Sequence, residues 1–121
     1  MLSVGVDIIE IARIGRAVTR WGARFLGHVY TDAEIAHCRG RVPELAARFA
    51  GKEAISKALG TGLNGIYWCE MEILPDRRGK PHVTLYGHAL ARAERLGLRQ
   101  WAISLSHSDE QAIALVVASA D

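Results

Sequence analysis

The hydrophobic pattern of this chain changes its period near Glu10, and that change defines its first two elements. The run Leu2–Ile9 is rich in β-branched residues, which predicts a strand. After it, apolar residues recur at steps of three and four, at Ile11, Ile14, Val18, Trp21 and Phe25. That spacing gives one apolar stripe of a helix, so we expect the strand to lead directly into the first helix.

Capping and turn residues predict the remaining elements. Thr31 and Glu34 form a capping-box pattern, so a short helix should begin there. Pro43 suits the start of a further helix and Gly60 suits its end. The second half predicts strands at 67–75 and 80–86, a helix at 87–96, and strands at 101–107 and 111–118. The order β-α-α-α-β-β-α-β-β favours an α+β fold over regular βαβ alternation.

Length and composition limit the function classes. The 121 residues predict a single domain over residues 1–121. The formal net charge of +2 is too small to indicate nucleic acid binding. Neither a secretory signal nor a membrane-spanning apolar run is present, so we expect no membrane association and a cytoplasmic location. Cys38 and Cys69 are then expected to be free thiols.

Asp7 is a carboxylate inside an apolar strand. An unpaired buried charge is costly, so its side chain must face water, a cation or a metal. A solvent-facing strand residue, or a cap for the following helix, would also explain it.

Glu53 and Lys57 lie four residues apart in the helix expected from Pro43. That spacing is typical of an exposed ion pair. Both residues also share a helical face with Ala46 and Ala50, and small neighbours leave room for a ligand or a metal. The residues alone leave both interpretations open.

The segment Gly60–Gly65 matches the dinucleotide-binding pattern G-x-G-x-x-G. Here the glycines end a helix instead of linking a strand to a helix, so the context argues against that function. A turn rich in backbone N–H groups beside Lys57 can cradle a phosphate. A helix cap followed by a loop is the alternative.

Four arginines, Arg13, Arg16, Arg20 and Arg24, follow helical spacing in the segment that begins near Glu10. Their spacing puts them on one face, where like charges without an interleaved acid repel one another. We interpret this face as a docking surface for an acidic partner, with a simple solvated face as the alternative.

His107 lies at the end of a predicted strand, where a histidine can either donate to a phosphate or serve as a satisfied turn residue. No Ser-His-Asp or Cys-His arrangement can be assembled from the spacing. Ordinary structural roles are expected for the other histidines, which are His28, His37, His82 and His88.

Six blocks occur in a characteristic order along the chain. They are Gly5-Val-Asp7-Ile, Arg13-Ile14, Arg48-Phe-Ala-Gly-Lys-Glu-Ala54, Lys57-Ala-Leu-Gly-Thr-Gly62, Gly79-Lys-Pro81 and Ser104-Leu-Ser-His107. Together they resemble the holo-[acyl-carrier-protein] synthases, the short type of phosphopantetheinyl transferase, over nearly the whole chain.

The resemblance implies the α+β phosphopantetheinyl transferase fold, assembled as a homotrimer with active sites at subunit interfaces. It implies magnesium-dependent transfer of 4'-phosphopantetheine from coenzyme A to a serine of apo acyl carrier protein, with release of adenosine 3',5'-bisphosphate. Asp7 and Glu53 match the metal ligands, and Glu53 and Lys57 match catalytic positions. Positions that match the coenzyme A site are Arg48, Lys52, Lys57, Gly60, Thr61, Gly62, Pro81 and His107.

Arg13 matches an arginine that docks the carrier protein, and helical geometry extends this surface to Arg16, Arg20 and Arg24. The general base stays open between a water on the metal, Glu53 itself and a nearby acid. The competing class is a non-catalytic basic module that binds an acidic protein or RNA. That class explains the arginines but gives Asp7 and Glu53 no purpose.

Overall fold

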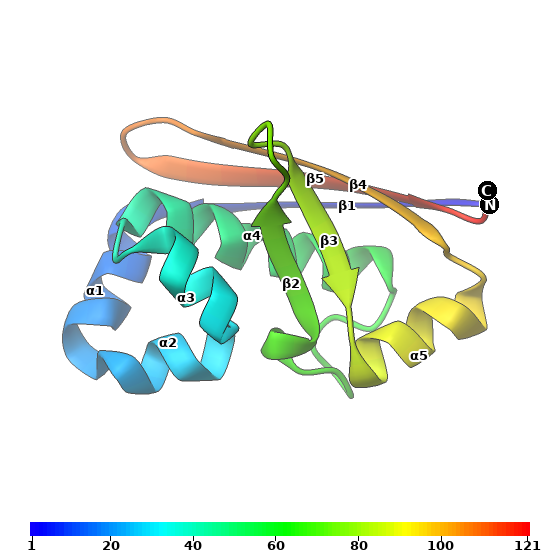
Figure 1. Ribbon diagram of the computed structural model, residues 1–121, viewed down its shortest axis with the longest axis horizontal. Coiled ribbons are helices and arrows are strands. Elements are labelled where there is room, and N and C mark those ends of the chain that lie inside the picture. The colour runs from blue at the N-terminus through cyan, green and yellow to red at the C-terminus, as the bar shows by residue number, and fades with distance from the viewer.

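The computed structural model describes all 121 residues. Figure 1 shows a long strand layer lying over helices, with a separate hairpin beside them. The elements are β1 (Leu2–Glu10), α1 (Ile11–Trp21), α2 (Ala23–Val29), α3 (Asp32–Cys38), α4 (Val42–Ala58), the 3-10 turn η1 (Trp68–Glu70), β2 (Met71–Pro75), β3 (Pro81–Leu85), α5 (Gly87–Leu96), β4 (Gln100–His107) and β5 (Gln111–Ser119). None of these helices has the length and hydropathy needed to cross a membrane.

The structure confirms the predicted α+β class and most predicted boundaries. The Thr31 hydroxyl accepts a hydrogen bond from the Glu34 N–H, and the Glu34 carboxylate accepts one from the Thr31 N–H, which completes the capping box. α5 ends at Leu96, before Gly97 in the left-handed conformation. Residues 68–70 were expected in a strand but form the 3-10 turn η1.

The single first helix predicted beyond Trp21 is wrong. Gly22 adopts φ 53° and ψ −131°, which ends α1 and starts α2 in a new direction. Glycine reaches this conformation without the penalty that a side chain would impose. The element order therefore contains one more helix than the sequence pattern indicated.

The strands form two separate antiparallel sheets. The larger has the order β1-β5-β4, and β2 pairs with β3 in a separate hairpin. α4 crosses the inner face of the larger sheet, where β1 and β5 both pack against it. Gly5 makes this close approach feasible, because a Cβ atom there would collide with the carbonyl oxygen of Ala54.

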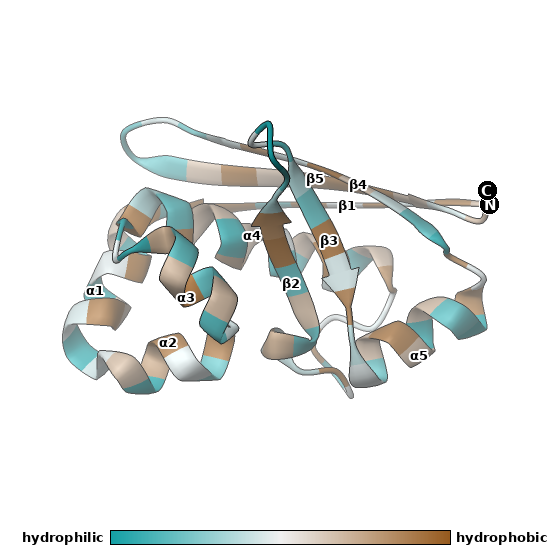
Figure 2. Ribbon diagram, viewed as in Figure 1, coloured by the Kyte–Doolittle hydropathy of each residue, from teal (hydrophilic) through white to brown (hydrophobic).

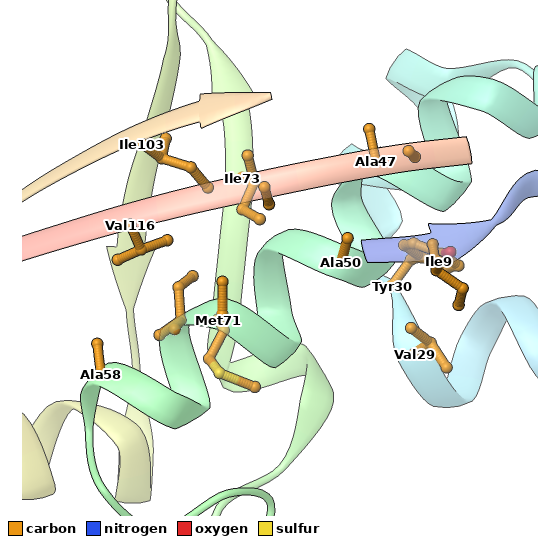
Figure 3. Close-up of a cluster of buried hydrophobic side chains, with 14 of the residues drawn as sticks. Ile9, Val29, Tyr30, Ala47, Ala50, Ala58, Met71, Ile73, Ile103 and Val116 are labelled. Carbon is orange, nitrogen blue, oxygen red and sulfur yellow. The ribbon is translucent and has the colours of Figure 1, made fainter. Parts of the chain in front are cut away.

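Polar residues lie at the surface of this fold, and apolar residues form its core. Figure 2 shows the turn between β2 and β3 as a strongly hydrophilic tip. Figure 3 shows the core beneath, a cluster of buried hydrophobic side chains that includes Ala47 and Ala50 of α4, Ile73 of β2, Ile103 of β4 and Val116 of β5. Ala50, Ile73 and Val116 have no exposed surface. The small residues of α4 that we had associated with room for a ligand are thus largely used to pack the helix against the strands.

The outer face of the larger sheet is apolar but uncovered. Its exposed residues are Leu2, Val4, Val6 and Ile8 of β1 and Ile113 and Leu115 of β5, and their exposed fractions range from 40% to 75%. Contiguous apolar surface of this kind usually marks an interaction site.

Candidate active site

Three charged side chains meet where β1 lies against α4. Lys57 Nζ lies 3.1 Å from Asp7 Oδ1 and donates a 2.9 Å hydrogen bond to the Val6 carbonyl oxygen. Glu53 lies one helical turn before Lys57 and is half-buried. Burial and the negative charge of Asp7 raise the pKa of Glu53, while the charges of Lys57 and Arg13 act in the opposite direction. The structure therefore brings the two predicted metal ligands and the predicted catalytic lysine together.

The donor set fits magnesium better than a closed protein metal centre. No group of three or more His, Cys, Asp or Glu side chains is arranged to hold a metal. Magnesium commonly takes one or two carboxylates and completes its shell with phosphate oxygens and water. The like-charge repulsion that raises the pKa of Glu53 would be relieved by a cation shared with Asp7.

The largest cavity, about 520 Å³, lies on another side of α4. Arg48, Pro81 and His107, predicted from distant parts of the chain, all line it. Asp7, Glu53 and Lys57 do not line it. The remaining lining residues are His37, Arg41, Glu44, Ala47, Pro75, Asp76, Arg77, Gly79, Leu105 and Ser106.

Sequence reasoning missed three basic residues of this cavity. His37 was expected to have an ordinary structural role, and Arg41 and Arg77 were not singled out. Burial and the positive charges of Arg48 and Arg41 lower the pKa of His37, as expected in a cationic cavity. The Arg77–Arg78 pair before Gly79 was the visible signal, whereas nothing local pointed to His37 or Arg41.

Part of the hydrogen-bonding capacity of the Arg48 guanidinium is used within the protein. Its side chain is 3% exposed, and Nε donates a 3.0 Å hydrogen bond to the Ile73 carbonyl oxygen. Its Nη1 donates to Glu44 Oε2, also at 3.0 Å. These contacts hold the guanidinium against the cavity wall and leave it fewer donors for a ligand.

The structure contradicts the predicted coenzyme A contact of Lys52. Its side chain is fully buried, and Nζ donates to Glu34 Oε1 at 2.7 Å, to the Trp68 carbonyl at 3.0 Å and to the Met71 carbonyl at 2.6 Å. An ammonium group has three donors, so none is left for a ligand. Successive residues of a helix point about 100° apart, so the Lys52 side chain can point into the interior while that of Glu53 points elsewhere.

The glycine turn follows Lys57 directly at the end of α4. Gly60 and Gly62 have φ values of 77° and 56°, and the Gly62 N–H donates to the Ser56 carbonyl oxygen at 3.2 Å. Thr61 also lines a smaller cavity of about 140 Å³ beside α5. The turn thus lies near Lys57, outside the large cavity.

The four predicted docking arginines are all exposed, but they do not lie on one helix. Arg13, Arg16 and Arg20 belong to α1, whereas Arg24 belongs to α2 beyond the break at Gly22. Arg24 lines a cavity of about 340 Å³ together with Trp21, Phe25 and His28. The basic surface is therefore continued around the bend between the two helices, next to apolar side chains.

Comparison with known proteins connects this geometry to a family. A model of the 4'-phosphopantetheinyl transferase superfamily matches residues 3–116. A holo-[acyl-carrier-protein] synthase of Herpetosiphon aurantiacus is 53% identical, with 97% of this chain and 98% of that protein covered.

Solved structures agree with the sequence relatives. The holo-[acyl-carrier-protein] synthase of Helicobacter pylori, in complex with coenzyme A, superposes with a TM-score of 0.88 at 32% identity, covering 96% of this chain and 99% of that one. The Bacillus anthracis enzyme, in complex with CoA (3',5'-ADP), superposes with a TM-score of 0.81 at 32% identity, covering 98% and 96%. The chain therefore belongs to the 4'-phosphopantetheinyl transferase superfamily, and within it to the holo-[acyl-carrier-protein] synthases.

Proposed function

We propose that the chain transfers the 4'-phosphopantetheine group of coenzyme A to a serine hydroxyl of apo acyl carrier protein and releases adenosine 3',5'-bisphosphate. The observation that carries this proposal is the meeting of Asp7, Glu53 and Lys57 between β1 and α4. Two carboxylates beside one ammonium group form a site that can hold a cation and a polyphosphate together.

Asp7 and Glu53 would hold the magnesium ion. When bound, magnesium neutralises and polarises a pyrophosphate and so favours departure of the nucleotide. Lys57 supplies a second positive charge, held in place by its hydrogen bond to the Val6 carbonyl and its contact with Asp7. A cation fixed before the reaction stabilises developing negative charge without reorganisation.

The large cavity would receive the nucleotide end of coenzyme A. Its volume of about 520 Å³ suits a nucleotide-sized ligand, and basic residues dominate its charged lining. Arg48, Pro81 and His107 come together here from three separate elements. Coenzyme A carries its pyrophosphate next to the nucleotide, so the nucleotide would lie in the cavity while the pyrophosphate approaches a carboxylate pair.

A homotrimer would complete this site. In one chain the carboxylate pair and the cavity are not continuous. Covering the apolar outer face of β1 and β5 with other subunits would remove exposed Leu2, Val4 and Ile8 from water. Such an assembly would allow the cavity of one subunit to approach the carboxylate pair of its neighbour.

The carrier protein would dock on α1 and α2. Arg13 lies close enough to Glu53 to affect its pKa, so a partner on α1 would lie beside the reacting groups. Arg16, Arg20 and Arg24 extend the positive surface away from that point. Charge complementarity of this kind directs association and orientation of an acidic partner.

The test is transfer to a purified apo acyl carrier protein in the presence of coenzyme A and magnesium, followed by mass spectrometry of the carrier. We expect the mass to rise by one phosphopantetheine group. Asp7→Asn and Glu53→Gln should each lower kcat/KM by about 100-fold or more, with the loss greatest at limiting magnesium. Glu94→Gln is the matched control, because Glu94 is exposed on α5. Full transfer by Glu53→Gln at limiting magnesium would refute the metal assignment, and no transfer by the wild-type chain would refute the function.

A further inference from the structure

The carbonyl groups that end α4 follow directly after Lys57 and need partners from outside the helix. The last carbonyls of an α-helix have no partner within it, and buried carbonyls are almost always paired. The Lys57 carbonyl accepts a hydrogen bond from the Gly60 N–H at 3.0 Å, so the glycine turn supplies one partner. The next two carbonyls belong to Ala58 and Leu59, which are both buried.

Two side chains from distant elements donate to these two carbonyls. The Ser3 hydroxyl of β1 donates to the Ala58 carbonyl oxygen at 2.6 Å. Arg92 of α5 donates through Nε to the Leu59 carbonyl oxygen at 3.1 Å. Both donors are half-buried, and the helix dipole favours a cation at the C-terminal end of a helix. The end of α4 is therefore held by β1 and by α5.

Ser3 lies on the strand that makes the other contacts of the last turn of α4. Lys57 Nζ donates to the Val6 carbonyl oxygen and lies 3.1 Å from Asp7 Oδ1. β1 thus contacts this turn both at the lysine head group and, through Ser3, at the helix end. Because Asp7 and Lys57 come from different elements, their relative position depends on how α4 is held along β1.

Arg92 lies against the glycine turn. A Cβ atom on Gly60 would lie 3.7 Å from Arg92 Nη2. The turn continues to Gly62, whose N–H donates to the Ser56 carbonyl oxygen at 3.2 Å. The bond from Arg92 to Leu59 therefore holds the point where α4 passes into this turn.

We propose that Ser3 and Arg92 are positioning residues for the reaction, which act through Lys57 and the glycine turn without touching the substrate. The inference rests on the proposed function, in which Lys57 stabilises the negative charge that develops on the pyrophosphate. Such a charge is effective only in the right place, and a displacement of about 1 Å can cost about 100-fold in rate. Loss of either bond should therefore lower kcat, while the KM for the carrier protein stays unchanged.

A double-mutant cycle separates positioning from a general loss of stability. Ser3→Ala should lower kcat about tenfold in the wild-type background but less than about twofold in a Lys57→Ala background, where the positioned lysine is gone. Single-turnover mass spectrometry of the carrier measures the slow variants. Ser3→Thr keeps the hydroxyl and should retain most of kcat. Ser119→Ala is the matched control, because this strand hydroxyl donates to the Asp121 carbonyl and not to α4.

Amide hydrogen exchange measured by NMR tests Arg92 without catalysis. Exchange at Gly60 and Gly62 should be about tenfold faster in Arg92→Gln than in the wild-type chain, because the end of α4 opens more often. Arg92→Lys keeps a donor and the charge, so its exchange rates should lie between the two. Arg99→Gln, which changes an exposed arginine after α5, should leave both glycines unchanged.

Three results would overturn the proposal. Additive losses in the cycle of Ser3→Ala and Lys57→Ala would show that the hydroxyl does not act through the lysine. Equal losses of kcat in Ser3→Ala and Ser119→Ala would indicate a general effect of removing a strand hydroxyl. Unchanged exchange at Gly60 in Arg92→Gln would show that the guanidinium does not hold the turn. A wild-type chain that transfers no phosphopantetheine would instead overturn the proposed function and this inference with it.

Discussion

Lys52 Nζ donates a 2.7 Å hydrogen bond to Glu34 Oε1, and neither side chain has exposed surface. Glu34 Oε2 accepts a further hydrogen bond from the Ile73 N–H at 2.8 Å. This buried pair ties α3 to α4 and to β2. Next along α4, Glu53 is only half-buried and lies near Asp7, where we propose that the two carboxylates hold a metal ion.

The pair predicts a large loss of stability when one member is removed. Lys52→Met or Glu34→Gln alone should lower the free energy of unfolding by about 3–5 kcal/mol, because each leaves an uncompensated buried polar group. The double variant Glu34→Leu/Lys52→Met should recover much of that loss. Urea unfolding measures this, and a Lys52→Met protein that remains folded but shows only a raised KM for coenzyme A would contradict it.

Gly5 predicts a second, steric effect. Gly5→Ala places a Cβ against the Ala54 carbonyl and should destabilise the protein by about 1–3 kcal/mol, because β1 and α4 would have to separate. Gly15→Ala is the control, since its Cβ would meet only Val42 Cγ1 at an ordinary 3.6 Å. Thermal unfolding should show Gly15→Ala neutral or stabilised, and equal destabilisation of both variants would refute the steric explanation.

The outer sheet face predicts a change in oligomeric state. Leu115→Lys should dissociate the assembly and reduce transfer activity strongly, because it places a charge in the proposed interface. Leu90→Lys on α5 is matched in exposure, at 42% against 46% for Leu115, and should leave the mass in solution unchanged. Light scattering measures both variants. A wild-type chain of monomeric mass with full activity would rule out the trimer.

The basic surface predicts a selective defect toward the carrier protein. Arg16→Glu combined with Arg20→Glu should raise the KM for the carrier about tenfold or more and flatten its salt dependence, while the KM for coenzyme A changes little. Arg95→Glu combined with Arg99→Glu controls for net charge, because it reverses two exposed charges elsewhere on the surface. Unchanged carrier kinetics at low salt would show that these arginines are merely solvated.

Glu70 predicts a pH dependence of stability. Burial acts to raise the pKa of Glu70, but the N–H groups of Tyr67 and His88 and the His88 ring outweigh it and lower the pKa. A carboxyl whose pKa is lowered by folding stabilises the protein above the ordinary pKa of glutamate, about 4.3, and the stabilisation is lost as pH falls through the lowered value. Glu70→Gln should therefore cost about 1 kcal/mol at pH 7, the size of a helix cap.

Unfolding measured from pH 7 down to pH 3 tests this sign. The difference between wild type and Glu70→Gln should shrink as pH falls, because the wild-type carboxyl becomes neutral. Glu94→Gln, an exposed glutamate of α5, should show no such convergence. A gap that widened toward low pH would contradict the assignment.

The sequence was sufficient wherever a structural feature depends on neighbours along the chain. The capping box of Thr31 and Glu34, the end of α5 at Gly97 and the turn between β4 and β5 depend on hydrogen bonds between residues that are close in the sequence. The spacing of the blocks around Asp7 and Glu53 was likewise sufficient to indicate the family. The break at Gly22 was missed because the apolar stripe continues across it, and only the backbone conformation separates α1 from α2.

Tertiary structure decided what each charged side chain faces. Lys52 and Glu53 are adjacent in sequence. Lys52 is buried and donates hydrogen bonds to carbonyl groups of η1 and β2, whereas Glu53 is half-buried near Asp7. Likewise, His37 and Arg77 reach the cavity because α3 and the β2–β3 turn converge there. Sequence periodicity fixes directions around one helix, whereas burial and partnership depend on which elements pack against it, and those elements come from distant parts of the chain.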